Sequence, residues 1–117
     1  MSVLTSVRDL KTHYLGLANP TRLAIISLLA RRELTASELA RKLKLSQPLL
    51  SWHLRIMRKS ALITTRRVGR EVHCSLDRKG IREYQDRFNQ FISENDRSAA
   101  SRGVPAALVN EEIANAI

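Results

Sequence analysis

The spacing of apolar residues predicts two helices at the start of the chain. The first, over residues 3–17, repeats apolar residues at steps of four and three, which share one helical face: Val3, Val7, Leu10, Tyr14 and Leu17. Asn19 suits the capping position of a second helix and Pro20 suits its first turn, so this helix runs from Pro20 to about Arg32. Its inward-facing residues are expected to be Leu23, Ile26, Leu29 and Ala30.

Two more helices, separated by a short turn, are predicted in the middle of the chain. Thr35 lies three residues before Glu38, which is the spacing of a capping box, and begins a short helix. Ser46 suits the capping position of the next helix, over residues 47–59. The inner faces of these two helices are apolar: Leu39, Leu43, Leu50, Leu54 and Met57.

A hairpin and a last helix complete the expected elements. Residues 62–67 and 71–76 are rich in β-forming residues and predict two strands, with Gly69 in their connection free to take a positive φ. A fifth helix over residues 79–94 has one apolar stripe: Ile81, Tyr84, Phe88, Phe91 and Ile92. Residues 98–117 are expected to form a linker and a C-terminal tail.

Two short helices followed by a basic hairpin is the element order of a winged helix-turn-helix. We therefore predict a mainly α (α+β) winged helix-turn-helix fold, with one domain over residues 1–97. Its helix-turn-helix spans residues 35–59 and its wing spans residues 62–76. The flanking helices, residues 1–17 and 79–94, are expected to form a dimer.

Positive charge is concentrated in the centre of the chain. The 117 residues have a formal net charge of +9, and residues 31–70 alone hold 11 Lys and Arg against two acidic residues. Eight of these 11 are arginine, which suits phosphate groups and base edges. The charge therefore indicates a polyanionic partner, although charge alone does not separate DNA from RNA or from an anionic membrane surface.

Composition excludes several other classes of protein. The 44% of hydrophobic residues is too high for a disordered basic tail, and a single cysteine excludes an internal disulfide framework. No apolar run approaches the roughly 20 residues that span a bilayer. No Gly-rich phosphate loop, paired-carboxylate motif or nucleophile–base arrangement is present, so we expect no enzymatic activity. The chain is therefore expected to be soluble and intracellular.

Four short motifs resemble the ArsR/SmtB family of bacterial and archaeal repressors. They are Leu17-Ala18-Asn19-Pro20-Thr21-Arg22-Leu23, Glu38-Leu39-Ala40, Leu45-Ser46-Gln47-Pro48 and Ser51-Trp52-His53-Leu54. The likeness continues through the expected wing to Leu76 and covers roughly residues 15–77. The resemblance implies an obligate homodimer, built from the first and last helices, that blocks transcription of its own or nearby genes. It also implies a location in the cytoplasm of a prokaryote, in association with the nucleoid.

The resemblance also implies which residues contact double-stranded DNA. Residues 46–59 correspond to the recognition helix, and the full expected set is Lys42, Lys44, Ser46, Gln47, Leu49, Ser51, Trp52, Arg55, Arg58, Arg66, Arg67 and Arg70. The family often has Thr at Leu49 and His at Trp52, so this chain replaces polar contacts by apolar ones, for example to thymine methyl groups. Trp52 has a second interpretation, as a core residue packed on the hairpin. The family favours Gly where this chain has Lys44, which predicts a strained turn.

Metal sensing, which is common in this family, is not expected here. Thr35 and Ser37 occupy the two thiol positions of the family's Cys-x-Cys site, and neutral hydroxyls are poor ligands for soft metals. The last helix has Glu83, Asp86 and Glu94 but no histidine. We predict no metal, no cofactor and structural roles for three scattered histidines, His13, His53 and His73. Cys74 is expected to be a buried small residue, with a redox switch as the alternative.

The apolar stripes of the first and last helices predict a homodimer, because one small core would not bury both. The expected interface residues are Val3, Val7, Leu10, Tyr14, Tyr84, Phe88, Phe91 and Ile92. The competing interpretation is that these residues pack onto the core of their own chain. Two other functions stay open: a winged-helix module that binds protein, and a nonspecific nucleoid or RNA-binding protein. The sequence indicates no inducer.

Overall fold

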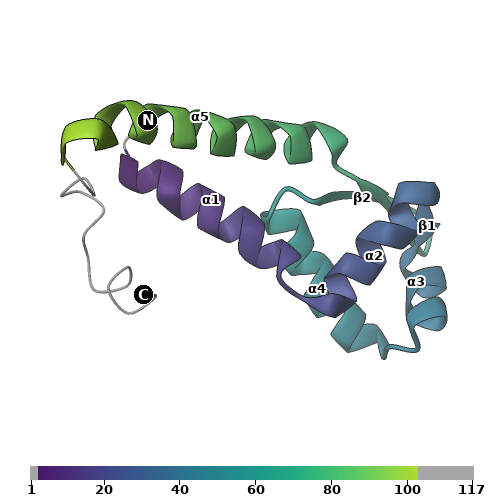
Figure 1. Cartoon of the computed structure of the whole chain (residues 1–117). Coiled ribbons are helices and arrows are strands. Elements are labelled where there is room, and N and C mark those ends of the chain that lie inside the picture. Colours follow the sequence, from purple (N-terminus) through teal and green to yellow (C-terminus); the bar gives the residue numbers. More distant parts are fainter. Residues whose placement is uncertain (1–2, 103–117) are drawn as a thin grey trace.

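The computed structural model describes the backbone of residues 3–102 and the side chains of residues 7–96. Its elements are α1 (Val3–Leu17), α2 (Pro20–Arg31), β1 (Leu34–Thr35), α3 (Ala36–Leu43), α4 (Gln47–Lys59), β2 (Ile63–Val68), β3 (Glu71–Leu76) and α5 (Arg78–Arg102). The predicted winged helix-turn-helix is confirmed. The long helices α1 and α5 run alongside each other and extend away from α2, α3 and α4 (Figure 1).

Side-chain caps set the starts of three helices, as the sequence predicts. The Asn19 side chain accepts a hydrogen bond from the backbone N–H of Arg22 at 3.1 Å and begins α2. Thr35 and Glu38 form the complete capping box of α3. The Ser46 hydroxyl accepts from the N–H of Leu49 at 3.3 Å and begins α4. Each cap satisfies a backbone donor that the first helical turn leaves without a partner.

The sheet has one strand more than the sequence predicts. Its order is β1-β3-β2, with both pairs antiparallel. Cys74 lies on the central strand, opposite Leu34 on one side and Thr65 on the other. Because β1 is only two residues long, it leaves no alternating pattern that a sequence could reveal.

Two expectations about helices are wrong. Leu23 is 51% exposed, and Ala30 is also exposed, so neither faces inward. The buried residues of α2 are Arg22, Ile25 and Leu29. Arg22 points inward and binds the end of α1, while Leu23, the next residue along the helix, lies on the surface.

The last helix is longer than predicted. α5 begins at Arg78 and ends at Arg102, so residues 98–102, which we expected to begin a linker, are helical. The segment Ser98-Ala99-Ala100-Ser101-Arg102 has no Gly or Pro to stop a helix, and Gly103 is the first such residue. The predicted tail from residue 103 onward lies outside the described residues.

Candidate nucleic-acid interface

The two faces of α4 differ in burial. The inner face is buried in the core and consists of Leu50, His53, Leu54 and Met57. The outer face is exposed and holds the residues expected to contact DNA: Gln47, Leu49, Ser51, Trp52, Arg55 and Arg58. Ser46, Lys42 and Lys44, which precede α4, are also exposed. The exposure of Trp52, at 47%, favours its surface interpretation over the core one.

A buried arginine that sequence analysis missed connects α4 to the end of α1. The Nε of Arg22 donates to the carbonyl of Gly16 at 2.8 Å, and its Nη2 donates to the carbonyl of Leu15 at 3.2 Å. These carbonyls belong to the last turn of α1, where backbone donors run out, and that of Leu15 also accepts from the N–H of Ala18 at 3.2 Å. The guanidinium carbon also lies 5.9 Å from the centre of the Trp52 ring, within the range of a cation–π contact.

The same arginine fixes the state of His53. The Nη1 of Arg22 lies 3.2 Å from Nδ1 of His53. Because a guanidinium can only donate, Nδ1 must accept and the imidazole must carry its proton on Nε2. Burial, with a smaller contribution from the Arg22 charge, lowers the pKa of His53. His53 is therefore a neutral structural residue, as was expected of the histidines.

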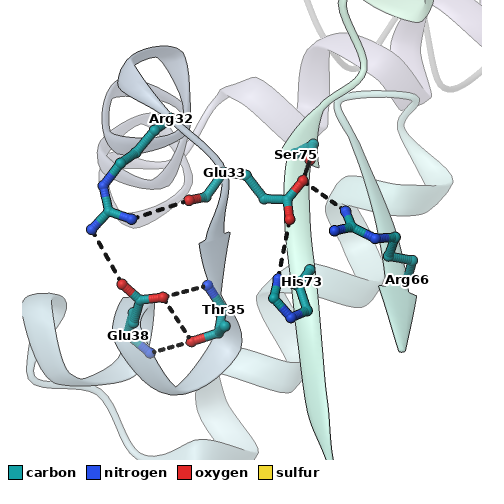
Figure 2. A network of polar contacts seen from close by, with 7 residues as sticks. All are labelled: Arg32, Glu33, Thr35, Glu38, Arg66, His73 and Ser75. Atoms are coloured by element: carbon teal, nitrogen blue, oxygen red, sulfur yellow. Dashed lines mark hydrogen bonds and ion pairs between the residues drawn. The ribbon is translucent and has the colours of Figure 1, made fainter. Parts of the chain in front are cut away.

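The two acidic residues of the basic central segment are both held in polar networks (Figure 2). One carboxylate oxygen of Glu33 accepts from Nη1 of Arg66 at 2.7 Å and from the hydroxyl of Ser75 at 2.9 Å. Its other oxygen lies 3.1 Å from Nδ1 of His73. These contacts, led by the Arg66 hydrogen bond, lower the pKa of Glu33 to about 2. Glu33 thus ties the α2–β1 connection to the outer face of both wing strands.

Glu38 is the second of these acids and acts locally. It accepts from the backbone N–H of Thr35 at 3.2 Å and from Nη2 of Arg32 at 3.2 Å (Figure 2). The Thr35 backbone hydrogen bond is the largest cause of the lowered pKa of Glu38. The capping-box spacing predicts the Thr35 partner of Glu38 from the sequence, whereas the partners of Glu33 were not predicted.

The expected wing arginines have different surroundings. Arg66 is bound to Glu33, whereas Arg67 and Arg70 are exposed near the tip. Arg58, at the end of α4, donates to the hydroxyl of Thr65 on β2 at 3.3 Å and so links α4 to the wing.

A buried histidine joins both long helices to the end of α4. Nδ1 of His13 lies 2.5 Å from the carbonyl of Ser60, and its ring stacks on Tyr84 with the ring centres 4.2 Å apart. Because the carbonyl can only accept, His13 carries a proton on Nδ1. Burial lowers the pKa of His13 more than this hydrogen bond raises it. Gly16, one turn along α1, packs so closely that a Cβ there would lie 2.4 Å from the Ser60 hydroxyl.

The residues expected at a dimer interface differ in how far their own chain buries them. Leu10 is 7% exposed and is buried within its own chain, which corrects its assignment to a partner-facing surface. Phe88 and Ile92 on α5 are 43% and 50% exposed. The others with described side chains are partly buried: Val7, Tyr14, Tyr84 and Phe91. The side chain of Val3 lies outside the described residues.

The positions of the family's metal-binding thiols do not fit a metal here. The Thr35 hydroxyl is occupied by the capping box of α3, where it accepts from the N–H of Glu38 at 3.1 Å. Among the residues that the structure describes, no group of three or more His, Cys, Asp or Glu could hold a metal ion. Cys74 is fully buried, and burial raises the pKa of its thiol to about 11, which suits the expected role of a small core residue.

Within the described part of the chain, no helix has the length and apolar character needed to cross a membrane.

Comparison with known proteins identifies a regulator family. A family model described as "Bacterial regulatory protein, arsR family" matches residues 19–65. The "Transcriptional repressor SmtB homolog" of Synechocystis sp. is 34% identical over 93 residues, covering 80% of this chain and 70% of that protein. The "Arsenical resistance operon repressor" of Staphylococcus xylosus is 32% identical over 102 residues, covering 85% of this chain and 94% of that protein.

A solved structure of an ArsR-like regulator shares the fold. The solved structure of an "ArsR-like Transcriptional Regulator" from Rhodococcus sp. matches with a TM-score of 0.70 at 25% identity. The match covers 83% of this chain and 92% of that one.

Proposed function

The chain belongs to the ArsR family of bacterial regulatory proteins, and from that premise we propose that it is a homodimeric repressor which binds a palindromic operator. It is a DNA-binding transcriptional regulator rather than an enzyme. What we propose beyond DNA-binding regulation is the dimer, the symmetry of the DNA site, and repression as the outcome of binding.

The observation that supports it best is the outer face of α4. This face presents hydrogen-bonding and apolar side chains along its first two turns and arginine in its second half. A major groove accommodates a helix and presents a different pattern for each base pair. Gln47 and Ser51 would contact base edges, while Arg55 and Arg58 would lie near phosphates. Arg67 and Arg70 at the tip of the wing would reach the neighbouring backbone or minor groove.

The exposed apolar residues of α5 support the dimer. Phe88 and Ile92 lie four residues apart on one helical face and are the large exposed apolar residues of this helix with described side chains. Water contact with two such side chains is unfavourable, and a second copy would cover both by two-fold symmetry. Two recognition helices related in this way would lie about one DNA turn apart, which is why a palindromic site is proposed.

Selection of bound duplexes from a random pool tests the DNA site. A regulator should prefer one short, imperfectly palindromic duplex over bulk DNA by at least about a thousandfold. A nonspecific nucleoid or RNA-binding protein would show no such preference. A protein-interaction module would bind neither the short duplex nor bulk DNA. Either result would contradict the proposal.

Light scattering tests the dimer. The chain mass is 13.3 kDa, and we expect about twice this value for the protein in solution. Phe88→Glu and Ile92→Glu should each shift the protein towards the monomer, because they place a charge in the interface. Leu23→Glu, at an exposed apolar residue on α2, should leave the mass unchanged and serves as the matched control.

A further inference from the structure

Two large apolar side chains project from the outer face of α4. Leu49 is 43% exposed and Trp52 is 47% exposed. A separation of three residues places them next to each other on one helical face. The residues that bury α4 in the core lie on the opposite face of the helix. Both side chains therefore keep a large exposed fraction that a ligand can contact.

The indole of Trp52 is ordered before any ligand arrives. Arg22 lies over the ring, and the ring of His53 lies 4.9 Å away at an interplanar angle of 66°. Arg22 is itself fixed by the two carbonyls at the end of α1. A side chain that is already held in place loses little conformational entropy on binding.

The chemistry of these side chains limits which base pairs they can contact favourably. Leu49 has no hydrogen-bonding group, and Trp52 has only an N–H donor. Neither can make the paired hydrogen bonds by which arginine contacts guanine or glutamine contacts adenine. The apolar feature of a base pair in the major groove is the C5 methyl group of thymine.

We propose that Leu49 and Trp52 recognise thymine methyl groups at two positions of each operator half-site. This inference rests on the proposed DNA-binding function and deepens it by naming the group that the apolar part of α4 selects. Gln47 and Ser51, which are exposed on the same helix, would contact the neighbouring base edges. Burial of one methyl group contributes about 0.8 kcal/mol, or about fourfold in affinity.

Replacement of thymine by deoxyuridine tests the proposal directly, because it removes the methyl group and keeps the base pair. Each thymine of the selected operator is replaced in turn, and binding is measured by titration. We expect an affinity loss of about fourfold at two positions of each half-site. Leu49→Ala should abolish the loss at one of these positions and Trp52→Ala at the other.

The control is Leu23→Ala, at a similarly exposed leucine on α2, which should keep both deoxyuridine effects. Circular dichroism checks that each variant folds, which is expected because the replaced side chains are exposed. If the unmodified protein prefers its operator and ignores every deoxyuridine replacement, the inference is overturned and the proposed function stands. If both variants keep the full deoxyuridine losses, the inference is also overturned. A failure to select any preferred duplex overturns the proposed function as well.

Discussion

Glu33 and Arg66 form a 2.7 Å ion pair that links the outer face of the wing to the connection between α2 and β1. The Arg66 hydrogen bond, followed by that of Ser75, lowers the pKa of Glu33 from 4.5 to about 2. A carboxyl group whose pKa is lower in the folded state contributes stability that is complete above pH 4.5. That contribution declines as the pH falls and is lost as it passes about 2.

Glu33→Gln should therefore reduce stability at neutral pH and remove this part of the acid sensitivity. Urea unfolding of both proteins between about pH 2 and pH 6 measures the difference in free energy. The difference should shrink as the pH falls through this window. Glu71→Gln, at an exposed residue of the same wing, provides the control. A difference that stays constant with pH would show that the Glu33 carboxylate is not stabilised by its partners.

Arg22→Lys tests the connection between α1 and α4. Lysine keeps the charge but cannot donate at once to the carbonyls of Gly16 and Leu15 and to the His53 ring. Loss of hydrogen bonds from a buried charged group costs on the order of 2 kcal/mol. Urea unfolding should show this loss, whereas Arg55→Lys, on the exposed face of α4, should change stability little. Equal effects of the two substitutions would contradict the structural role of Arg22.

Gly16→Ala tests the close approach of α1 to the end of α4. A Cβ at this position would lie 2.4 Å from Oγ and 2.6 Å from Cβ of Ser60, so the two segments would have to separate. Overpacking of this kind costs about 1–3 kcal/mol. Ser60→Gly removes both clashing atoms and leaves the backbone carbonyl that binds His13. The double variant should therefore be more stable than Gly16→Ala alone, and a lack of rescue would place the cost elsewhere.

Lys44→Gly should stabilise the fold. Lys44 ends α3 in the left-handed conformation, with φ 56° and ψ 45°. This conformation agrees with the strain predicted for the turn. A side chain in that region costs about 1 kcal/mol, which glycine avoids. Lys44→Ala is the matched variant, since it removes the charge and keeps the Cβ. Thermal unfolding should show a gain for glycine and none for alanine; the same result for both would assign the effect to charge.

The helix starts could be predicted because their causes are local. Asn19, Thr35 and Ser46 each bind a backbone N–H three residues away, so the signal lies in adjacent sequence. The strain at Lys44 could also be predicted from the sequence, because lysine stands where the family favours glycine. The exposed outer face of α4 followed from its helical spacing, because the core residues of that helix leave only one face for contact.

The contacts of Arg22 and Glu33 could not be predicted in the same way. Arg22 binds a histidine 31 positions away, and Glu33 binds residues 33 to 42 positions away. Periodicity shows which residues share a face and does not show which faces meet. It also assumes that a charged residue faces water, and this assumption placed Leu23 inward in error.

The three wing arginines should contribute differently to DNA binding, because the structure shows an acidic partner for only one of them. Arg66 is held by Glu33, whereas Arg67 and Arg70 are exposed near the tip. Each lysine or arginine that neutralises a phosphate adds about one to the slope of log affinity against log salt concentration. Arg67→Ala and Arg70→Ala should each lower this slope by about one, and Arg66→Ala should lower it less.

Binding titrations with the selected operator over a range of salt concentrations measure these slopes. Arg82→Ala, on the exposed side of α5, should leave the slope unchanged and is the control. Glu33→Gln removes the negative charge that holds Arg66, so Arg66→Ala in that background should lower the slope by more than it does in the natural chain. An equal effect of Arg66→Ala in both backgrounds would show that the ion pair does not compete with phosphate. If the equal effect is a decrease of about one in each background, Arg66 is a direct DNA contact like Arg67 and Arg70.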